Sequence, residues 1–233
     1  MSVTEPIWLR PERGARGPRP AHRREDIAAT AVRLADAEGL DGVSLRRVAT
    51  ELGTGPATLY RYIVNKDELF DLMVDAVLGE ARPPEPSGDW RTDLSAVAAA
   101  QRELALRHPW LAGLPASRPS LGPNGLAWQE ATYATLAGLG LTADETLLRV
   151  QTVLTFVRGH VIEELAEREA VRRSGQDLRG WLDIQSAYGE SIMGSGRYPE
   201  LSRIMLEAET PHAADRFDRL FQYGLARLLS GIG

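Results

Sequence analysis

The 233-residue chain contains no cysteine. This absence excludes disulfide bonds, thiolate nucleophiles and zinc sites built on cysteine ligands. The chain also has no apolar run near the roughly 20 residues that a membrane-spanning helix needs. Its Arg- and Pro-rich beginning has no hydrophobic signal core. We therefore expect a cytoplasmic protein without a membrane partner.

Familiar catalytic motifs are absent as well. The sequence has no Gly-x-x-x-x-Gly-Lys loop, no His-Glu-x-x-His and no Gly-x-Ser-x-Gly. Gly53, Thr54 and Gly55 begin like a dinucleotide-binding fingerprint, but Thr58 stands where a third glycine is needed. That fingerprint must also follow a strand, and a helix is expected here. We expect no catalytic residue and no cofactor, and an enzyme is the weakest of three functional hypotheses.

A metal site is a further alternative for one histidine. His160 is followed by Glu163 and Glu164, which helical spacing could bring together. Two ligands on one helix need a third from elsewhere in the chain, so a polar patch at an interface is the better interpretation. We therefore expect no metal.

Lysine occurs once, at Lys66, and every other basic residue is arginine. The net charge of −5 divides unevenly, with +3 over residues 1–66 and −8 over residues 67–233. A protein that binds nucleic acid needs positive charge where it meets phosphate. The asymmetry therefore places any such surface in the N-terminal part.

Strand patterns are missing, because apolar residues recur at helical spacing throughout the chain. A hydrophobic fraction of 43% is enough for a buried core. The sequence therefore predicts an all-α fold. Helices are expected over residues 23–38, 65–80, 89–107, 124–137, 142–169, 178–193, 199–207 and 213–229, in addition to two short helices described next.

The stretch from Ser44 to Ile63 predicts two short helices joined by a tight turn. Ser44 is a good N-cap for the first helix. Gly53 supplies the left-handed residue that ends it, and Pro56 suits the first turn of the second. Leu59 falls on the inner face of that second helix. This pattern is typical of a helix-turn-helix.

The outer surface of the second helix carries Thr58, Tyr60, Arg61 and Tyr62. A core helix would not present so many polar and aromatic groups over so short a length. A helix in a DNA major groove needs donors for base edges, hydroxyls for phosphates and flat rings for sugars and thymine methyls. The surface therefore favours double-stranded DNA as a partner.

Residues 24–80 resemble the DNA-binding domain of the TetR/AcrR (tetracycline-repressor) family of regulators, over about a quarter of the chain. The resemblance implies an N-terminal three-helix helix-turn-helix domain followed by a larger helical domain that binds a small-molecule effector and dimerises. It further implies a ligand-responsive regulator, in most cases a repressor, that binds a palindromic operator as a homodimer. The matching segments are Ile27–Ala31, Ala37–Ala49, Leu52–Gly53, Thr58–Tyr62 and Asn65–Leu69.

The resemblance also implies which residues contact DNA. Arg46 and the segment from Pro56 to Tyr62 would face base edges, while Ser44, Thr58, Tyr60 and Lys66 would hold phosphates. The full candidate set is Ser44, Arg46, Thr54, Gly55, Pro56, Ala57, Thr58, Tyr60, Arg61, Tyr62 and Lys66.

Three parts of the chain follow from composition. Residues 1–21, rich in Pro, Gly and Arg, predict a disordered basic arm. Residues 22–82 form the expected helix-turn-helix domain, and the Pro-rich segment that follows breaks the helix. The resemblance implies that residues 89–233 form the effector-binding and dimerisation domain. Two interpretations of the arm stay open: an inert solvated tail, or a segment that follows phosphates or a minor groove. The second would use Arg16, Arg19, Arg23 and Arg24.

Aromatic residues of the second domain are candidates for an effector pocket. Trp110, Trp128, Tyr133 and Phe156 lie on elements that would surround a cavity in a family member, and Arg158 and His160 are the polar candidates. The alternative is that these aromatics only fill a core. In that case the protein would be an architectural DNA-binding dimer without an effector. In either case, the helix from Thr142 and the final helix have more apolar surface than one small domain can bury, so we expect them to pair with a second copy as a four-helix bundle.

Overall fold

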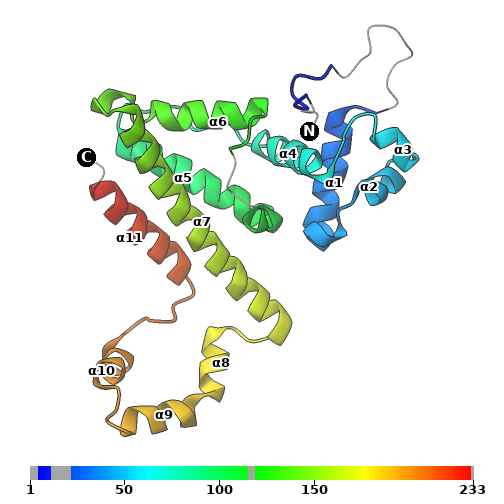
Figure 1. Cartoon of the computed structure of the whole chain (residues 1–233). Helices are drawn as coiled ribbons and strands as arrows, with labels where there is room; N and C mark the ends of the chain where they lie inside the picture. Colours follow the sequence, from blue (N-terminus) through cyan, green and yellow to red (C-terminus); the bar gives the residue numbers. More distant parts are fainter. Residues whose placement is uncertain (1–4, 12–21, 115–118, 232–233) are drawn as a thin grey trace. The chain divides into compact units, whose positions relative to one another are not determined.

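The computed structural model describes residues 5–11, 22–114 and 119–231. Every regular element in these residues is a helix (Figure 1), which confirms the all-α prediction. The elements are α1 (Arg24–Glu38), η1 (Leu40–Gly42), α2 (Leu45–Glu51), α3 (Pro56–Leu59), α4 (Lys66–Leu78), α5 (Trp90–Arg107), η2 (Pro109–Gly113), α6 (Pro123–Ala134), η3 (Ala137–Leu139), α7 (Ala143–Ser174), α8 (Leu178–Ile184), α9 (Ser186–Gly194), α10 (Pro199–Glu207) and α11 (Arg216–Ser230).

One expected helix, over residues 178–193, is two. It breaks at Gln185, whose backbone lies at φ −86° and ψ 2°. The amide of Gln185 donates to the carbonyl of Leu182 at 2.9 Å, a three-residue bond that tightens the last turn of α8. Neither glycine nor proline marks this break in the sequence.

Local capping follows the sequence closely. Ser44 Oγ accepts from the amide of Arg47 at 3.2 Å, and Gly53 has φ +67°. Asn65 Oδ1 likewise accepts from the amide of Glu68 at 2.8 Å. The Glu68 carboxylate, however, does not complete a capping box with Asn65, because it accepts from the amide of Val64 instead.

The chain divides by compactness into two units, Met1–Leu154 and Thr155–Gly233. This division falls inside α7, whereas the sequence placed a boundary at residues 83–88. The difference arises because α4 packs on α6 and α1 packs on η2, so elements on both sides of that segment share one compact unit. The compact units therefore do not coincide with the expected domains, and the domain boundary after residue 82 stays a prediction.

The core of the first unit forms where α1 crosses α4, and α2 and α3 cover one side of it (Figure 1). Leu104 of α5 and Trp110 of η2 are buried in this same core. The helix-turn-helix is thus built on a core to which the following helices contribute. The fully buried residues of this core include Ile27, Ala31, Val48, Ala49, Leu59, Ile63, Leu69, Met73 and Val77.

The N-terminal prediction of disorder is wrong for residues 5–11. Ile7 is only 2% exposed and belongs to the core of the first unit. Arg24 donates to the carbonyls of Ile7 and Arg10 at 2.8 Å each, and Arg10 pairs with Glu68. Burial of an apolar side chain offsets the entropy of ordering this short segment. The rest of the expected arm, residues 1–4 and 12–21, lies outside the described residues.

Asp75 fastens α4 to the beginning of α6. It is 5% exposed, and its carboxylate accepts from the amide of Gly125 at 2.9 Å and from Asn124 Nδ2 at 3.2 Å. Asp75 therefore caps α6 from another helix, satisfying amide donors that have no partner within α6. A Cβ at Gly122 would lie 2.2 Å from Asp75 Oδ1, so the contact requires glycine there.

The second unit contains the C-terminal part of α7 and the helices α8 to α11. Phe156 of α7 stacks on Phe221 of α11 with ring centroids 5.9 Å apart. A Cβ at Gly224 would lie 2.6 Å from the ring of Phe156. Glycine at position 224 therefore permits the close approach of α11 to α7.

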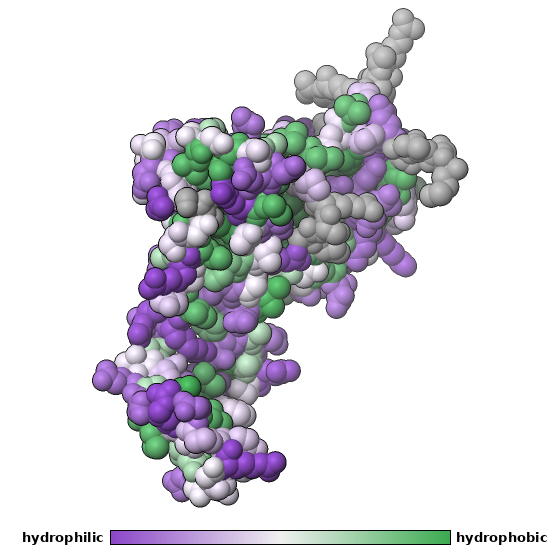
Figure 2. Space-filling view, turned by 60° about the vertical axis from the view of Figure 1, so that its left-hand side comes forward, coloured by the Kyte–Doolittle hydropathy of each residue, from purple (hydrophilic) through white to green (hydrophobic). Residues whose placement is uncertain are grey.

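Several helices leave apolar side chains exposed in the single chain. On α7, Leu148 is 70% exposed and Ile162 is 46% exposed in the single chain, so the apolar surface expected to pair with a second copy is present. No residue of α8, α9 or α10 is buried. Figure 2 shows hydrophobic side chains reaching the surface in the part that carries these three helices. The larger exposed side chains there are Trp181, Ile184, Tyr188, Leu201, Ile204 and Leu206.

Replacing Gly224 by alanine tests the packing of α11 on α7. The new methyl group would displace the Phe156 ring from its contact with α11, so Gly224→Ala should lower the free energy of unfolding by about 1–3 kcal/mol. Gly189→Ala on α9 is the matched control, since nothing lies within 4 Å of its added Cβ. Because alanine is the better helix former, the control should be neutral or stabilising by up to about 1 kcal/mol. Denaturant unfolding measures both, and equal stability of the two variants would contradict this packing.

Candidate DNA-binding surface and effector-binding domain

The helix-turn-helix is held by two buried side chains. Leu59, at the end of α3, and Ile63, just after it, are both fully buried. Helix α3 is shorter than the sequence predicts, since it ends at Leu59 and the chain continues as turns through Tyr62. The amides of Tyr62 and Ile63 still donate to the carbonyl of Leu59, at 2.9 and 3.0 Å. The buried pair thereby fixes which side of the segment faces outward.

The outward side presents groups that the protein itself does not engage. Arg46 and Arg61 are exposed, and neither forms an ion pair with another described residue. Tyr60 is 58% exposed. Arg47, next to Arg46 on α2, differs, since it pairs with Glu38 at 2.8 Å and with Glu51. The two neighbouring arginines are therefore chemically distinct, and Arg46 is the one available for a base edge.

The other candidates surround this face. Gly55, Pro56 and Ala57 are exposed at the beginning of α3, while Thr54 and Thr58 are half-buried. These five residues bring backbone and small side chains to the surface, where a duplex could approach closely.

Three further candidates differ in how far the protein itself uses them. Ser44 is exposed, and its oxygen already caps α2, which leaves its O–H free to donate. Tyr62 is half-buried and packs on the core. Lys66 is exposed at the first turn of α4, with its Nζ 5.1 Å from the centre of the Phe70 ring. An ammonium and free amides at one helix beginning suit a phosphate.

Of the four arginines proposed for an N-terminal arm, only Arg23 and Arg24 lie within the described residues. Arg16 and Arg19 lie outside the described residues. Arg24 is committed to the carbonyls of the folded segment 5–11, and Arg23 pairs with Glu25 at 3.2 Å. Contact between the arm and DNA stays a prediction.

Two of the effector-pocket candidates fasten the first unit together. Trp110 Nε1 donates to Asp36 Oδ1 on α1 at 2.7 Å. Trp128 Nε1 donates to the carbonyl of Leu78, the last residue of α4, at 2.9 Å. Both indoles are at most 5% exposed. Their N–H groups are therefore already used, and any contact with a ligand would be through the rings. Tyr133, on α6, is half-buried.

The remaining pocket candidates lie in the second unit, on α7. His160 is buried among three phenylalanine rings, with its centroid 5.2 Å from Phe221 and 6.0 Å from Phe156. Its Nε2 lies 3.8 Å from the Glu164 carboxylate, four residues along the helix. Arg158 is half-buried. The structure thus brings Phe156 and His160 together as one aromatic cluster.

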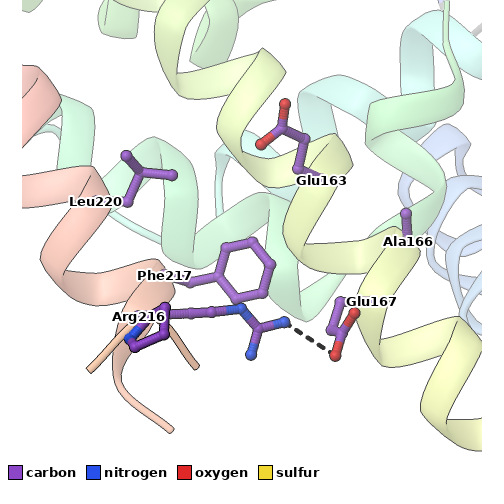
Figure 3. Close-up of a pocket in the computed structure, with 7 residues that line it drawn as sticks. Glu163, Ala166, Glu167, Arg216, Phe217 and Leu220 are labelled. Carbon is purple, nitrogen blue, oxygen red and sulfur yellow. Dashed lines mark ion pairs between the residues drawn. The ribbon is translucent and has the colours of Figure 1, made fainter. Parts of the chain in front are cut away.

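An open pocket of about 670 Å³ lies between α7 and α11 in the second unit. Figure 3 shows the Phe217 ring in its centre, with Glu163 on one side and the ion pair of Arg216 with Glu167 on the other. That ion pair has an N–O distance of 2.9 Å. Glu163 lines this pocket, whereas Glu164 is the carboxylate that faces His160. In the described part of the chain, no three acidic or histidine side chains are grouped as a metal site.

Sequence reasoning missed a buried histidine of the first unit. His108 is 5% exposed, and its Nδ1 lies 2.8 Å from Asp36 Oδ1 while its Nε2 lies 3.0 Å from Glu80 Oε2. Burial acts to lower its pKa, but hydrogen bonds to the two carboxylates outweigh that effect and raise the pKa above its usual value. Its partners are 72 and 28 residues away in sequence, so no local motif marks this histidine.

Comparison with protein families agrees with this arrangement of elements. The family model for bacterial regulatory proteins of the tetR family matches residues 27–73, and the model for the tetracyclin repressor-like C-terminal domain matches residues 82–233. The chain belongs to the TetR family. In the described residues of this family member, no helix is long and apolar enough to cross a membrane.

Individual TetR-family relatives match nearly the whole chain. It is 38% identical over 230 residues to the HTH-type transcriptional repressor DrrR1 of Streptomyces coeruleorubidus, which covers 98% of this chain and 83% of the relative. It is 35% identical over 229 residues to an HTH-type transcriptional regulator of Saccharopolyspora erythraea, with 97% and 92% covered. Among solved structures, ActR of Streptomyces coelicolor in complex with actinorhodin matches with a TM-score of 0.73 and 31% identity, covering 91% of this chain and 95% of that one.

Substituting neighbouring arginines tests the surface. Arg46→Ala should weaken binding to the cognate duplex by ~1–3 kcal/mol and relax its sequence preference, because a base contact is lost. Arg47→Ala is the matched control, since Arg47 is engaged by two carboxylates, and it should leave affinity nearly unchanged. Lys66→Ala should weaken all duplexes alike and flatten the salt dependence by roughly one unit. Fluorescence anisotropy at several salt concentrations measures these effects. Unchanged binding by both Arg46→Ala and Lys66→Ala would show that this face does not meet DNA.

Proposed function

We propose that this TetR-family protein is a ligand-responsive transcriptional repressor that binds a palindromic operator as a homodimer and is released by a small-molecule effector. The observation that carries the proposal is that the helix-turn-helix segment has one side in the core and one side exposed to solvent. Leu59 and Ile63 are fully buried, while Arg46, Tyr60 and Arg61 stand outward and uncommitted. We place the protein in the cytoplasm, where its DNA is, and propose that it acts by binding rather than by catalysis.

The relatives support the two halves of this function. DrrR1 is named a transcriptional repressor, which supports repression here. ActR has been solved with actinorhodin and with (S)-DNPA bound, which supports a small-molecule effector. The competing possibility, an architectural DNA-binding dimer, requires that no small molecule alter operator binding.

Dimerisation follows from the exposed apolar surface of the second unit. On α7, Thr155, Gly159, Ile162 and Ala166 are exposed and follow each other at spacings of four, three and four residues. That spacing forms one uncharged stripe along a helix. On α11, Leu220 is 48% exposed and Tyr223 is 63% exposed. We propose that these faces pack on a second copy, so that two recognition segments can read half-sites about 34–36 Å apart or a multiple of that distance.

Leu225 lies on the apolar stripe of α11, but the structure does not leave it available for pairing with a second copy. Leu225 is 3% exposed in the single chain, so its side chain serves the fold of one copy. Substituting it would disrupt folding and could not report on association.

A charge on the α7 stripe tests dimerisation. Ile162→Glu should yield monomers, because a carboxylate would be buried without a partner in the pairing face. Leu206→Glu on α10 is the control, since Leu206 is 74% exposed and lies away from the stripe. Sedimentation gives the mass of each variant. Monomers from Leu206→Glu alone would place the dimer interface on α10 instead.

Release by an effector requires a connection to α4, and α6 provides one. Asp75 of α4 caps α6, and Trp128 of α6 donates to the carbonyl of Leu78, one turn further along α4. A shift of α6 upon ligand binding must therefore displace α4 or break these hydrogen bonds. Because α4 begins directly after the helix-turn-helix, its displacement changes the position of the recognition segment.

Loosening this connection should reduce the coupling between effector and operator. A screen for compounds that raise Tm, beginning with actinorhodin and (S)-DNPA, finds a ligand of the native state. In the wild type, that ligand and operator should weaken each other about 5–150-fold, equally in both directions. Trp128→Phe keeps an aromatic ring but lacks the N–H that donates to Leu78, so it should bind the ligand and show a smaller coupling factor. Calorimetric titration of the ligand with and without operator measures this coupling factor. Equal ligand affinity in the two titrations of the wild type would favour the architectural alternative.

A further inference from the structure

Five side chains join α1 and α4 to the elements that follow the segment 82–88. They are Asp36 on α1, Glu80 just after α4, Arg107 and His108 at the end of α5, and Trp110 on η2; we call them the His108 cluster. Asp36 accepts from His108 and from Trp110 through the same oxygen. Glu80 meets His108 at 3.0 Å and Arg107 at 3.5 Å, and Arg107 also pairs with Glu103.

The geometry requires a charged histidine. A neutral imidazole has one donor and one acceptor nitrogen, whereas an ionised carboxylate only accepts. Both ring nitrogens of His108 face carboxylate oxygens, so a neutral ring would point one lone pair at an acceptor. In the charged form both nitrogens donate, and the positive charges of His108 and Arg107 balance the negative charges of Asp36 and Glu80.

The raised pKa of His108 sets the direction of the pH dependence. A group whose pKa is raised by folding contributes stability that is fully present below its unfolded value, about 6.5, and is lost as the pH rises through the folded value. The pairing of His108 with the two carboxylates is therefore complete below about pH 6.5 and weakens as the pH rises through the raised pKa. When these hydrogen bonds are formed, the His108 cluster fixes the position of α1 and α4 relative to α5 and η2.

That position matters for DNA binding because α1 supports the helix-turn-helix. Helix α1 packs on both α2 and α4, and Trp110 of η2 is buried in their shared core. Covalently, only α4 leads from the recognition segment into the remaining helices, but the His108 cluster adds a second, non-covalent connection through α1. Without it, the two recognition segments of a dimer would be less well ordered before binding, and ordering them would cost affinity.

We propose that His108 is a positioning residue for operator binding: in its charged form it holds α1 and the end of α4 to α5 and η2, and operator affinity falls when it becomes neutral. The proposal rests on the proposed function, since it requires a protein that binds a specific duplex.

The experiment uses the full chain and the duplex that the wild type selects from a random-sequence DNA pool. Operator affinity is measured at constant salt, because salt alone changes phosphate contacts. Between about pH 6 and about pH 9, on either side of the ordinary histidine value, the wild-type affinity should fall on the order of fivefold or more. His108→Gln should bind weakly and without this pH dependence. His212→Gln, which changes an exposed histidine, should keep the wild-type profile.

A second variant separates positioning from folding, in case His108→Gln is unstable. Asp36→Asn keeps an oxygen for Trp110 but removes one negative charge from the ring. The pKa of His108 should then decrease, and the midpoint of the affinity profile should move to lower pH. A residue that only filled space would not move that midpoint.

The outcomes distinguish the two proposals. If no duplex is selected from the pool, the proposed DNA-binding function fails. If a duplex is selected but wild-type affinity is constant over the pH range, or if His108→Gln keeps the wild-type pH profile, the positioning role is refuted. An unchanged midpoint in Asp36→Asn also refutes it.

Discussion

Helix α4 cannot shift relative to α6 without breaking hydrogen bonds between the two helices, and the position of the helix-turn-helix depends on this constraint. Its buried Asp75 caps α6, and its last carbonyl, at Leu78, accepts from Trp128. Buried hydrogen bonds of this kind are costly to break one at a time, because each freed group is left without a partner. The helix therefore responds to its neighbours by discrete shifts, which suits an element that carries a signal.

The second unit is governed by a different constraint, which is apolar surface that one copy cannot bury. Its aromatic cluster around His160 is closed within the chain, but α8, α9 and α10 bury no side chain. Large apolar side chains grouped on neighbouring helices and left exposed are typical of interaction sites. Helices α7 and α11 hold the inner cluster and also carry the exposed side chains of the proposed pairing face. These side chains lie on different faces of the two helices, so a substitution on the outer face can change association without loss of the inner packing.

Features that depend on a few neighbouring residues could be predicted from the sequence. Ser44, Gly53 and Pro56 determine helix ends through contacts within four residues, and the structure places all three as expected. The helical period identified Leu59 as an inward residue, and it is fully buried. The all-α class and most helix bounds follow from the same period. Exposure of Arg46, in contrast to the engagement of Arg47 by carboxylates, could not be predicted, because Glu38 lies on another helix.

The sequence by itself determined the helices, the helix-turn-helix and the residue types available for DNA, because these depend on local backbone preference and periodicity. Only the tertiary structure decided what several of these residues do. Trp110 and Trp128 were candidates for a ligand pocket because they are aromatic. In the structure, their N–H groups donate hydrogen bonds to α1 and α4. His108 had no motif, yet it lies between two carboxylates. A hydrogen bond forms only when donor and acceptor lie within about 3 Å of each other. Folding creates these short distances between residues that are far apart in sequence, so the sequence pattern does not reveal them.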